Sequence, residues 1–338
     1  MTGTALTAFI DKHHTRLLAA ILIAAAALRL IGLGTLPPFI DESGHIAFLN
    51  PIHPTFFQLG KILGQFVFRL ASGLSSDTLY ALRLVIALFG VLTTFGVFLT
   101  GRLLGGTPAG LLAALFWALM PIVTFHDRLA LHDPMISLFH IWSAYLFLIA
   151  VQRRDIRLAA AAGLLSGLAA LVKLPLLPLA AGPLLLGFIG LPRDQWSEHK
   201  NLALAYAAGL LAAMLILVPN AGLLFSGNIY QQTGIGAGSS SLSRLFTNLG
   251  HVYSWLSGYN TIAFVLAAAA AAWLAIRGQN PLPKLLLGLF AVPVFAMSLL
   301  LNAFFARYLL VTLLPLTLLM ALTLSTLLFS ADAEAVNE

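Results

Sequence analysis

Long apolar runs separated by short polar breaks dominate the chain. Most runs are long enough to cross a bilayer, since an α-helix rises 1.5 Å per residue and the hydrocarbon core takes about 20 residues. The sixth run is shorter, and Pro175 and Pro178 lie around its start. We predict about ten membrane spans, over residues 17–36, 82–101, 107–125, 131–151, 157–175, 176–191, 201–219, 261–276, 284–303 and 308–329.

The runs predict helices rather than barrel strands. Backbone N–H and C=O groups inside hydrocarbon must be bonded within the protein, which leaves helices and closed barrels as spanning structures. Barrel strands alternate apolar and polar residues, and these runs are uniformly apolar. The predicted fold is an all-α polytopic transmembrane helix bundle in which residues 1–338 form a single integral membrane domain.

Two longer breaks interrupt the runs. Residues 37–81 are amphipathic, because apolar residues recur at helical spacing while Lys61, Gln65 and Arg69 share another face. We expect amphipathic interfacial helices there. Residues 220–260 contain several glycines and a run of serines, so this loop is either a lid over a site or a plain linker.

The composition indicates a membrane protein and excludes several functional classes. Of the 338 residues, 60% are hydrophobic and 9% are charged, whereas soluble domains carry about 25% charged residues. The formal charge of +6 is spread over short loops, so it indicates membrane orientation rather than nucleic-acid binding. The lack of cysteine excludes disulfides, thiolate metal sites and a cysteine nucleophile.

The distribution of Lys and Arg predicts the topology, because cytoplasmic loops carry an excess of basic residues. With the N-terminus inside, ten basic residues lie on the inner side and six on the outer side. Several of these six lie in the long loops, where they count less. We expect a multi-pass protein of the cell membrane with both termini cytoplasmic, a cytoplasmic tail at 330–338, and loops 37–81 and 220–260 outside.

Two adjacent acids, Asp41 and Glu42, lie where the chain leaves the first span. A charge near hydrocarbon is costly, so such groups face a cavity, a partner or a substrate. The alternative is a solvated helix end, with Asp41 capping the helix that follows. Arg29 lies about two turns inside the first span, and it needs a buried partner or a water-filled cleft for the same reason.

A second polar group lies in the short segment between the third and fourth spans. The segment is so short that both spans must emerge side by side, which holds Asp127, Arg128 and Asp133 at the height of Asp41. Arg128 could simply neutralise an aspartate. Alternatively, the acids and the neighbouring histidines could attract Mg²⁺ or Mn²⁺. We assign no metal ligands and keep a divalent cation as this alternative.

Basic residues at later span ends complete a candidate site. Lys173 lies at the outer end of the fifth span, and Arg307 with Tyr308 begins the last one. Lys173 could merely extend its charge to the membrane interface. A cationic ring facing the acids would hold an anion beside a carboxylate base, and its members would be Lys61, Arg128, Lys173 and Arg307.

In their order, and on one predicted side of the membrane, these residues resemble the motifs of the GT-C superfamily of integral membrane glycosyltransferases. The chain is similar to the branch that contains protein O-mannosyltransferases and the bacterial aminoarabinose transferases that modify lipid A. The resemblance covers about residues 15–320 and rests on Asp41, Glu42, His53, Pro54, Arg128, Asp133, Pro134, Lys173, Arg307 and Tyr308.

The resemblance implies a polyprenyl-phosphate sugar donor and an inverting transfer to an acceptor hydroxyl on the extracytoplasmic face. It makes Asp41 the general base, while Glu42 and Asp133 position acceptor or sugar hydroxyls. It leaves open the sugar and whether the acceptor is a protein, a lipid or a glycan. The residues expected to bind phosphate or substrate are Arg128, Lys61, Lys173, Arg307, His53 and Tyr308.

The chain also departs from the family pattern. Eleven residues separate Glu42 from Pro54, and Thr55-Phe56-Phe57 replaces the usual second proline, which leaves the register of Lys61 open. No extracytoplasmic C-terminal domain follows the tenth predicted span, so we expect a reduced enzyme, one that works with a partner, or an inactive relative. The alternative function is a transporter or flippase for a lipid-linked or anionic substrate. Against it, the polar residues gather at one surface.

The charge distribution makes the topology testable. Reporter fusions after Asp77 and after Ser240 should give an external signal, and a fusion after Gln195 a cytoplasmic one. A cytoplasmic signal from the fusion after Asp77 would place the candidate site on the wrong face of the membrane and exclude the expected chemistry.

Overall fold

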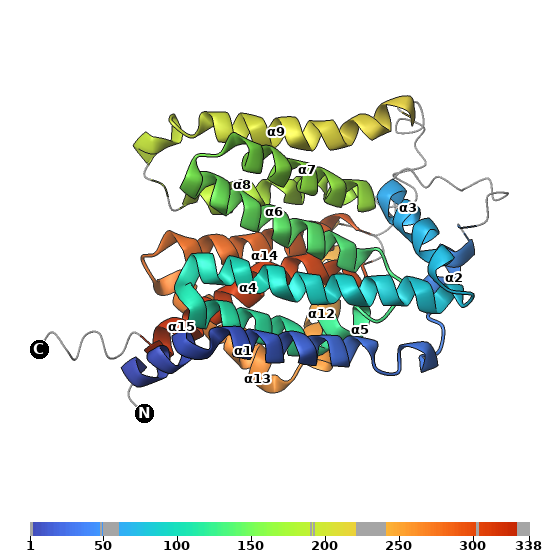
Figure 1. The fold of residues 1–338 in the computed structure, drawn as a ribbon, viewed down its shortest axis with the longest axis horizontal. Helices are drawn as coiled ribbons and strands as arrows, with labels where there is room; N and C mark the ends of the chain where they lie inside the picture. Colours follow the sequence, from blue (N-terminus) through green and yellow to red (C-terminus); the bar gives the residue numbers. More distant parts are fainter. Residues whose placement is uncertain are drawn as a thin grey trace, which may run out of the picture.

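The structure is a computed structural model that describes residues 3–47, 49, 61–189, 191, 193–220, 241–301 and 304–329. Within these ranges the chain forms helices and no strands, as predicted. The long helices lie side by side, with the start of α1 and the end of α15 at one end of the bundle and α2 and α3 at the other (Figure 1). The α-helices are α1 (Gly3–Leu30), α2 (Ile40–Ala47), α3 (Ile62–Ala71), α4 (Thr78–Leu119), α5 (Pro121–His126), α6 (Asp133–Arg153), α7 (Ile156–Val172), α8 (Ala181–Ile189), α9 (Lys200–Met214), α12 (Ser241–Tyr259), α13 (Ile262–Arg277), α14 (Pro281–Leu300) and α15 (Leu310–Phe329). Short 3₁₀ helices connect several of them, among them η1 (Leu33–Thr35), η4 (Leu174–Ala180), η6 (Leu215–Asn220) and η7 (Ala306–Leu309).

In the described chain, six helices are long and apolar enough to cross a membrane. One of them, α4, has 42 residues, but it leaves helical geometry around Gly106, whose φ of 80° glycine adopts without strain. The chain reverses there, since a Cβ added at Gly110 would lie 2.7 Å from the carbonyl oxygen of Phe98. α4 therefore contains the predicted span 82–101 and most of the next one. Shorter apolar helices, α7, η4 with α8, and α13, account for the other predicted segments.

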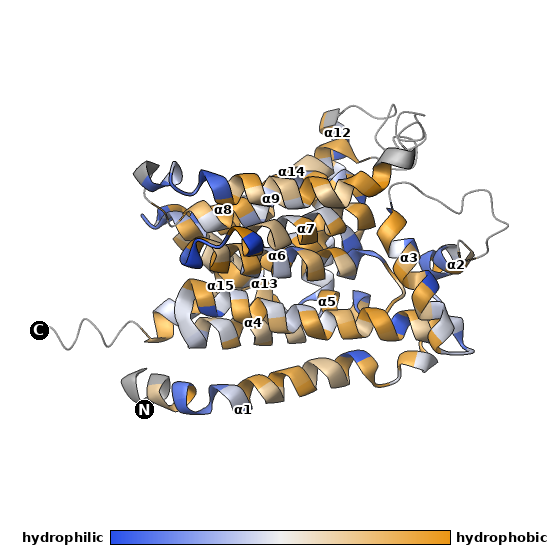
Figure 2. Ribbon diagram, turned by 45° about the horizontal axis from the view of Figure 1, so that its top comes forward, coloured by the Kyte–Doolittle hydropathy of each residue, from blue (hydrophilic) through white to orange (hydrophobic). Residues whose placement is uncertain are grey.

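α15 and α6 form the centre of the bundle. Most of their side chains are buried, and α15 packs against α4, α6, α13 and α14. In α1 and α9, by contrast, few side chains are fully buried. Hydrophobic residues cover the sides of the bundle, and hydrophilic ones gather towards its ends (Figure 2). Exposed apolar surface of this extent suits contact with lipid rather than water.

The two predicted loops contain helices. In the first, α2 and α3 agree with the expected interfacial helices, although residues 50–60 lie outside the described part. In the second, residues 241–259 form α12 rather than loop. Nδ2 of Asn248 in α12 donates to the carbonyl oxygens of Ser298 and Leu301 at the end of α14, each at 2.9 Å. The glycine-rich part at 221–240, and with it the lid or linker alternative, lies outside the described residues.

α7 and α9 pack with their backbones in direct contact. A Cβ added at Gly209 would overlap the carbonyl oxygen of Ala160, and one at Gly163 would overlap that of Tyr206. Small residues allow such close approach between membrane helices. Tyr206 is buried beside this contact, and its hydroxyl donates to the carbonyl oxygen of Ala180 (2.6 Å), so α9 is also fixed to the segment that leads into α8.

This contact predicts that Gly209→Ala destabilises the protein. The new methyl group must push two backbones apart, and overpacking of this kind costs about 1–3 kcal/mol. Thermal unfolding of the purified protein in detergent measures the loss. Gly288→Ala is the matched control, because no atom lies within 4 Å of a Cβ added there. Equal melting temperatures for the two variants would contradict the backbone contact.

Candidate active site

A buried ion pair between Arg83 and Glu42 connects α4 to the chain segment that follows the first span. After α1 the chain turns at Gly32, with φ 67°, and a proline-rich segment leads into α2. Arg83 donates from Nε to Oε1 of Glu42 (2.8 Å) and from Nη2 to Oε2 (2.6 Å), and neither side chain contacts solvent appreciably. The other N–H groups of Arg83 bind backbone carbonyls of the exit segment, those of Leu33, Leu36 and Pro37.

Glu42 also holds the loop between α5 and α6. Its oxygens accept the N–H groups of Ala130 and Phe39, each at 2.7 Å. One turn further along α2, Nδ1 of His45 donates to the carbonyl oxygen of Ala130 (2.7 Å). Burial alone would raise the pKa of Glu42, but the hydrogen bonds from Arg83, Ala130 and Phe39 and the charge of Arg83 outweigh it and lower the pKa. One face of α2 therefore binds both backbone groups of Ala130 and places the start of α6.

This geometry does not agree with the substrate contact expected of Glu42. Its two carboxylate oxygens already accept four hydrogen bonds, and its side chain is fully buried. No oxygen of Glu42 faces open space where an acceptor or sugar hydroxyl would bind. The structure instead makes Glu42 a positioning residue that orients α2 and the α5–α6 loop around the adjacent Asp41.

Four charged residues from distant parts of the sequence form the centre of the candidate site. Nη1 of Arg307, in η7, donates to Oδ2 of Asp41 (2.5 Å), and its Nε lies 3.5 Å from Oδ2 of Asp133. Nζ of Lys173, at the end of α7, donates to Oδ1 of Asp133 (2.8 Å). Lys173 is mostly buried, so it is engaged in an ion pair rather than extended to the membrane interface. We call these four residues the charged cluster.

Tyr308 and Lys61 border the charged cluster. Nζ of Lys173 lies 3.5 Å from the centre of the Tyr308 ring, and the guanidinium of Arg307 lies 5.3 Å from it, so the ring face stabilises both cations. Lys61 immediately precedes α3 and lines the same cavity as Lys173 and Tyr308. Burial, and then the charge of Lys173, lower the pKa of Lys61. The cationic form of Lys61 would be stabilised by an anion bound here.

Asp41 is the most accessible acid at this site. About a third of its side chain is exposed (32%), compared with 8% for Asp133 and 0% for Glu42. Its carboxylate binds Arg307 on the last span rather than capping α2. A partly open carboxylate beside a group of cations can accept a proton from a group that approaches from outside the bundle.

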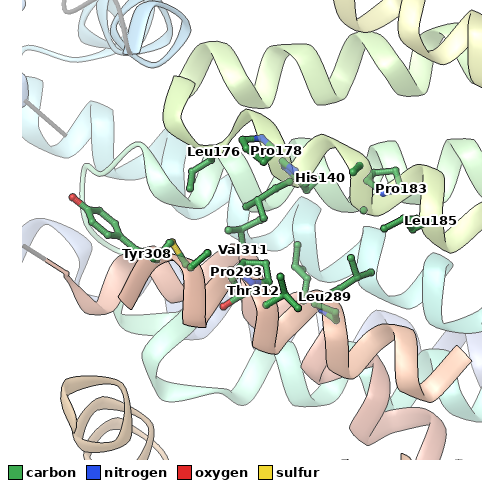
Figure 3. A pocket seen from close by; sticks show the side chains of 18 of the residues that line it. His140, Leu176, Pro178, Pro183, Leu185, Leu289, Pro293, Tyr308, Val311 and Thr312 are labelled. Carbon is green, nitrogen blue, oxygen red and sulfur yellow. The ribbon is translucent and has the colours of Figure 1, made fainter. Parts of the chain in front are cut away.

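An apolar cavity of about 730 Å³ extends from the charged cluster into the bundle. Lys61, Lys173 and Tyr308 line its polar end. Beyond them, η4 and α8 form one wall, and α14 and α15 form the opposite wall (Figure 3). Five prolines contribute to these walls, Pro175, Pro178, Pro183, Pro293 and Pro315. Lys173 lines this apolar space and pairs with Asp133, so the charged cluster adjoins the polar end of the cavity.

Arg128 and Asp127 lie outside the charged cluster, so the expected cationic ring lacks Arg128. Nη2 of Arg128 donates to the carbonyl oxygen of Ile31 at the end of α1 (2.8 Å). Asp127 forms a buried ion pair with Arg29, with Oδ2 2.8 Å from Nε. This pair supplies the partner that Arg29 was predicted to need, and it occupies the aspartate that we considered as a partner of Arg128.

The described histidines near the site contact backbone carbonyls and each other rather than forming a metal-binding group. Nδ1 of His126 donates to a backbone carbonyl (2.7 Å), and the rings of His45 and His132 stack with their centres 4.1 Å apart. In the part of the chain that the structure describes, no three His, Asp or Glu side chains are placed to hold a metal ion together. The alternative of a divalent cation therefore has no ligand set there. His53 lies outside the described residues.

Arg83 is the functional residue that we missed in the sequence, where it entered only the count of basic residues. The signal was available, since Arg83 lies just inside the span predicted at 82–101. A charge at that depth needs a partner by the same rule that we applied to Arg29. The role of Ala130 has no sequence signal, because it rests on backbone groups that almost every residue carries.

The chain matches one protein family and is similar in fold to several solved structures. The family described as dolichyl-phosphate-mannose-protein mannosyltransferase matches residues 53–222. A sequence comparison with curated proteins finds no match. In fold, the chain is similar to ArnT from Cupriavidus metallidurans bound to undecaprenyl phosphate, with 17% identity and a TM-score of 0.66 over 91% of this chain and 60% of that one.

Two structures of the oligosaccharyltransferase from Archaeoglobus fulgidus share the fold. The one tethered to an acceptor peptide has 15% identity and a TM-score of 0.62, over 98% of this chain and 51% of that one. The one with an inhibitory peptide and a dolichol-phosphate has 14% identity and a TM-score of 0.55, over 96% and 52%. The chain thus spans about half to three fifths of the length of these solved proteins.

The Arg83–Glu42 pair predicts that Glu42→Gln destabilises the protein strongly. The amide removes the negative charge and leaves a buried arginine uncompensated, which costs about 3–5 kcal/mol. Glu198→Gln is the control, because Glu198 and Arg154 form an exposed pair at 3.2 Å, worth about 0–1 kcal/mol. Thermal unfolding in detergent compares the two variants, and similar losses would refute the proposed importance of the buried pair.

The same pair predicts a dependence on pH. The pKa of Glu42 is lower in the folded protein than its ordinary value of 4.5, so the unfolded chain takes up the proton first as the pH falls. The stabilisation is fully present above about 4.5 and is lost as the pH falls through the lower folded pKa. Unfolding measured across this range should show a steeper loss for the wild type than for Glu42→Gln.

Proposed function

The chain belongs to the dolichyl-phosphate-mannose-protein mannosyltransferase family, within the GT-C glycosyltransferases, and we propose that it transfers a sugar from a polyprenyl-phosphate donor to an acceptor hydroxyl. Enzymes of this group use lipid-linked donors, and the fold and membrane-embedded helices of the chain agree with such a reaction. The observation that carries the proposal is that the charged cluster, which contains the partly exposed carboxylate of Asp41, adjoins an apolar cavity that its member Lys173 lines.

The cavity suits a polyprenyl phosphate in both size and polarity. Ligand pockets commonly enclose about 300–1,000 Å³, and this cavity has about 730 Å³ with apolar walls. An isoprenoid chain would lie between the wall formed by η4 and α8 and the wall formed by α14 and α15. Its phosphate would then lie at the polar end, within reach of Lys61, Lys173 and Arg307. Hydrogen bonds from these charged groups to phosphate are stronger than hydrogen bonds between neutral groups.

The charge balance of the site also favours a phosphate donor. Three cations, Lys61, Lys173 and Arg307, face two carboxylates, Asp41 and Asp133, which leaves one positive charge in excess. A phosphodiester-linked donor carries a single negative charge and would neutralise it. When the sugar leaves, the polyprenyl phosphate gains negative charge, and the fixed cations stabilise that developing charge.

In the proposed reaction Asp41 is the general base. The acceptor oxygen attacks the anomeric carbon of the sugar and forms a new C–O bond, while the bond from that carbon to the phosphate oxygen breaks. Asp41 takes the hydroxyl proton, and the polyprenyl phosphate leaves with the electron pair. Attack opposite the leaving group inverts the anomeric centre. Asp133, which binds both Lys173 and Arg307, positions the cations.

The ion pair between Arg307 and Asp41 suggests how donor binding prepares the base. One carboxylate oxygen of Asp41 is engaged by Arg307, and an incoming phosphate competes for the same guanidinium. Arg307 would then donate hydrogen bonds to the phosphate instead of to Asp41, which leaves the carboxylate of Asp41 free to accept a proton. Under the predicted topology this chemistry takes place on the extracytoplasmic face, with an acceptor that approaches from outside the bundle.

Asp41→Asn tests the proposal. The amide keeps the size of the side chain but cannot accept the proton, so transfer should fall by about 10²-fold or more, the usual contribution of a positioned acid or base. Donor binding should persist, because a carboxylate that competes for Arg307 is removed. The assay incubates the purified protein with labelled polyprenyl-phosphate sugars and a membrane extract, and measures transfer and donor binding on the same sample.

Asp77→Asn is the matched control, because Asp77 caps α4 through the N–H of Tyr80 (3.0 Å) and an amide oxygen caps equally well. Lys173→Met should show the opposite pattern to Asp41→Asn, with weakened donor binding. Full transfer by Asp41→Asn would overturn the role of Asp41. Movement of labelled donor across vesicles without transfer to any acceptor would favour the transport alternative.

A further inference from the structure

A second, smaller hollow contains none of the four residues of the charged cluster. It has a volume of about 350 Å³ and is lined by residues from the end of α1 and from the junction of α4 and α5, with Arg128 among them. It shares no lining residue with the larger cavity. Three of its apolar residues have widely exposed side chains, namely Leu28, Leu119 and Phe125.

Arg128 brings an uncompensated charge to this hollow. Arg29, Arg83 and Arg307 each form an ion pair with a carboxylate, whereas in the described part of the chain Arg128 has none within 4 Å. One N–H of Arg128 binds the carbonyl oxygen of Ile31. Its Nε is buried and has no partner among the described residues. A guanidinium with unused donors at the edge of hydrocarbon favours an external anion.

From these observations we propose that the hollow binds one anionic glycerophospholipid of the surrounding bilayer. Arg128 would bind the headgroup phosphate, since guanidinium groups match phosphate oxygens with paired hydrogen bonds. The first part of an acyl chain would lie against Leu28, Leu119 and Phe125. The ligand is a lipid rather than a free anion because the rest of the hollow is mostly apolar and several of its apolar side chains are exposed.

The hollow is built on a rigid part of the protein. Asp127, adjacent to Arg128, is fixed by its buried pair with Arg29. Gly90 of α4 lies directly against that pair, so that an added Cβ would collide with it. The backbone at Arg128 is therefore held in place before any lipid binds, and the hydrogen bond to Ile31 restricts the side chain, which lowers the entropy cost of binding. This site is independent of the proposed transfer reaction and of the donor cavity.

Native mass spectrometry of the full chain tests the proposal. The protein is purified in mild detergent and equilibrated with equal amounts of phosphatidylglycerol and phosphatidylcholine. The wild type should retain one phosphatidylglycerol preferentially. Arg128→Gln keeps an N–H donor for Ile31 but loses the charge, so its retention should fall about tenfold or more. Arg128→Lys should retain an intermediate amount.

Two controls separate this site from general effects. Arg277→Gln removes an exposed arginine that stacks on Trp273 and lines neither cavity, and it should leave retention unchanged. Lys173→Met alters the proposed donor site and should also leave it unchanged. If Arg128→Gln fails to fold, Leu119→Trp fills the hollow while the arginine stays in place, and it should reduce retention as well.

Several outcomes would overturn the proposal. These are equal retention of the two lipids by the wild type, unchanged retention in Arg128→Gln or Leu119→Trp, and a loss in Lys173→Met as large as in Arg128→Gln. Displacement of the lipid by millimolar glycerol phosphate would identify a simple anion site without a role for the acyl chain. Failure of the transfer assay would not affect this result, because lipid retention is measured without a donor or an acceptor.

Discussion

The buried pair of Arg83 and Glu42 is the interaction on which the site depends. A carboxylate and a guanidinium at this depth are tolerated only because nearly every donor and acceptor has a partner. Those partners are backbone groups of the exit segment after α1 and of the α5–α6 loop. The pair therefore joins three separate chain segments, and the open carboxylate of Asp41 is held one residue away from it.

Around that fixed point the other charges divide into two kinds. Arg29 with Asp127 is closed off from solvent and has a structural role. The charged cluster is partly open, and its two carboxylates and two cations come from α2, the start of α6, the end of α7 and η7. The cluster adjoins an apolar cavity, so a single ligand can place a charged group beside the cluster and an apolar chain in the cavity. A lipid-linked sugar phosphate has both parts.

Much of the site could be predicted because its residues lie at span ends. Asp41, Asp133, Lys173 and Arg307 all occupy such positions, and their proximity agrees with the structure. Arg128 was expected in the cationic ring, but it lies outside the charged cluster, because adjacent residues in a short loop can point to opposite sides. Glu42 differs from its expected role for a related reason, since adjacent residues on α2 face different partners. Residues 241–259 were predicted as loop because the helix there is too polar to resemble a span.

The sequence by itself determined that the chain is an all-α membrane bundle and where most of its apolar helices lie. Hydrocarbon allows little choice, because it demands apolar side chains and internally satisfied backbone groups over a fixed length. Only the tertiary structure decided which charges pair, which stay open and which segments enclose a cavity. Those outcomes depend on distances of a few ångströms between segments far apart in the chain, such as the 266 residues that separate Asp41 from Arg307, and no local pattern encodes them.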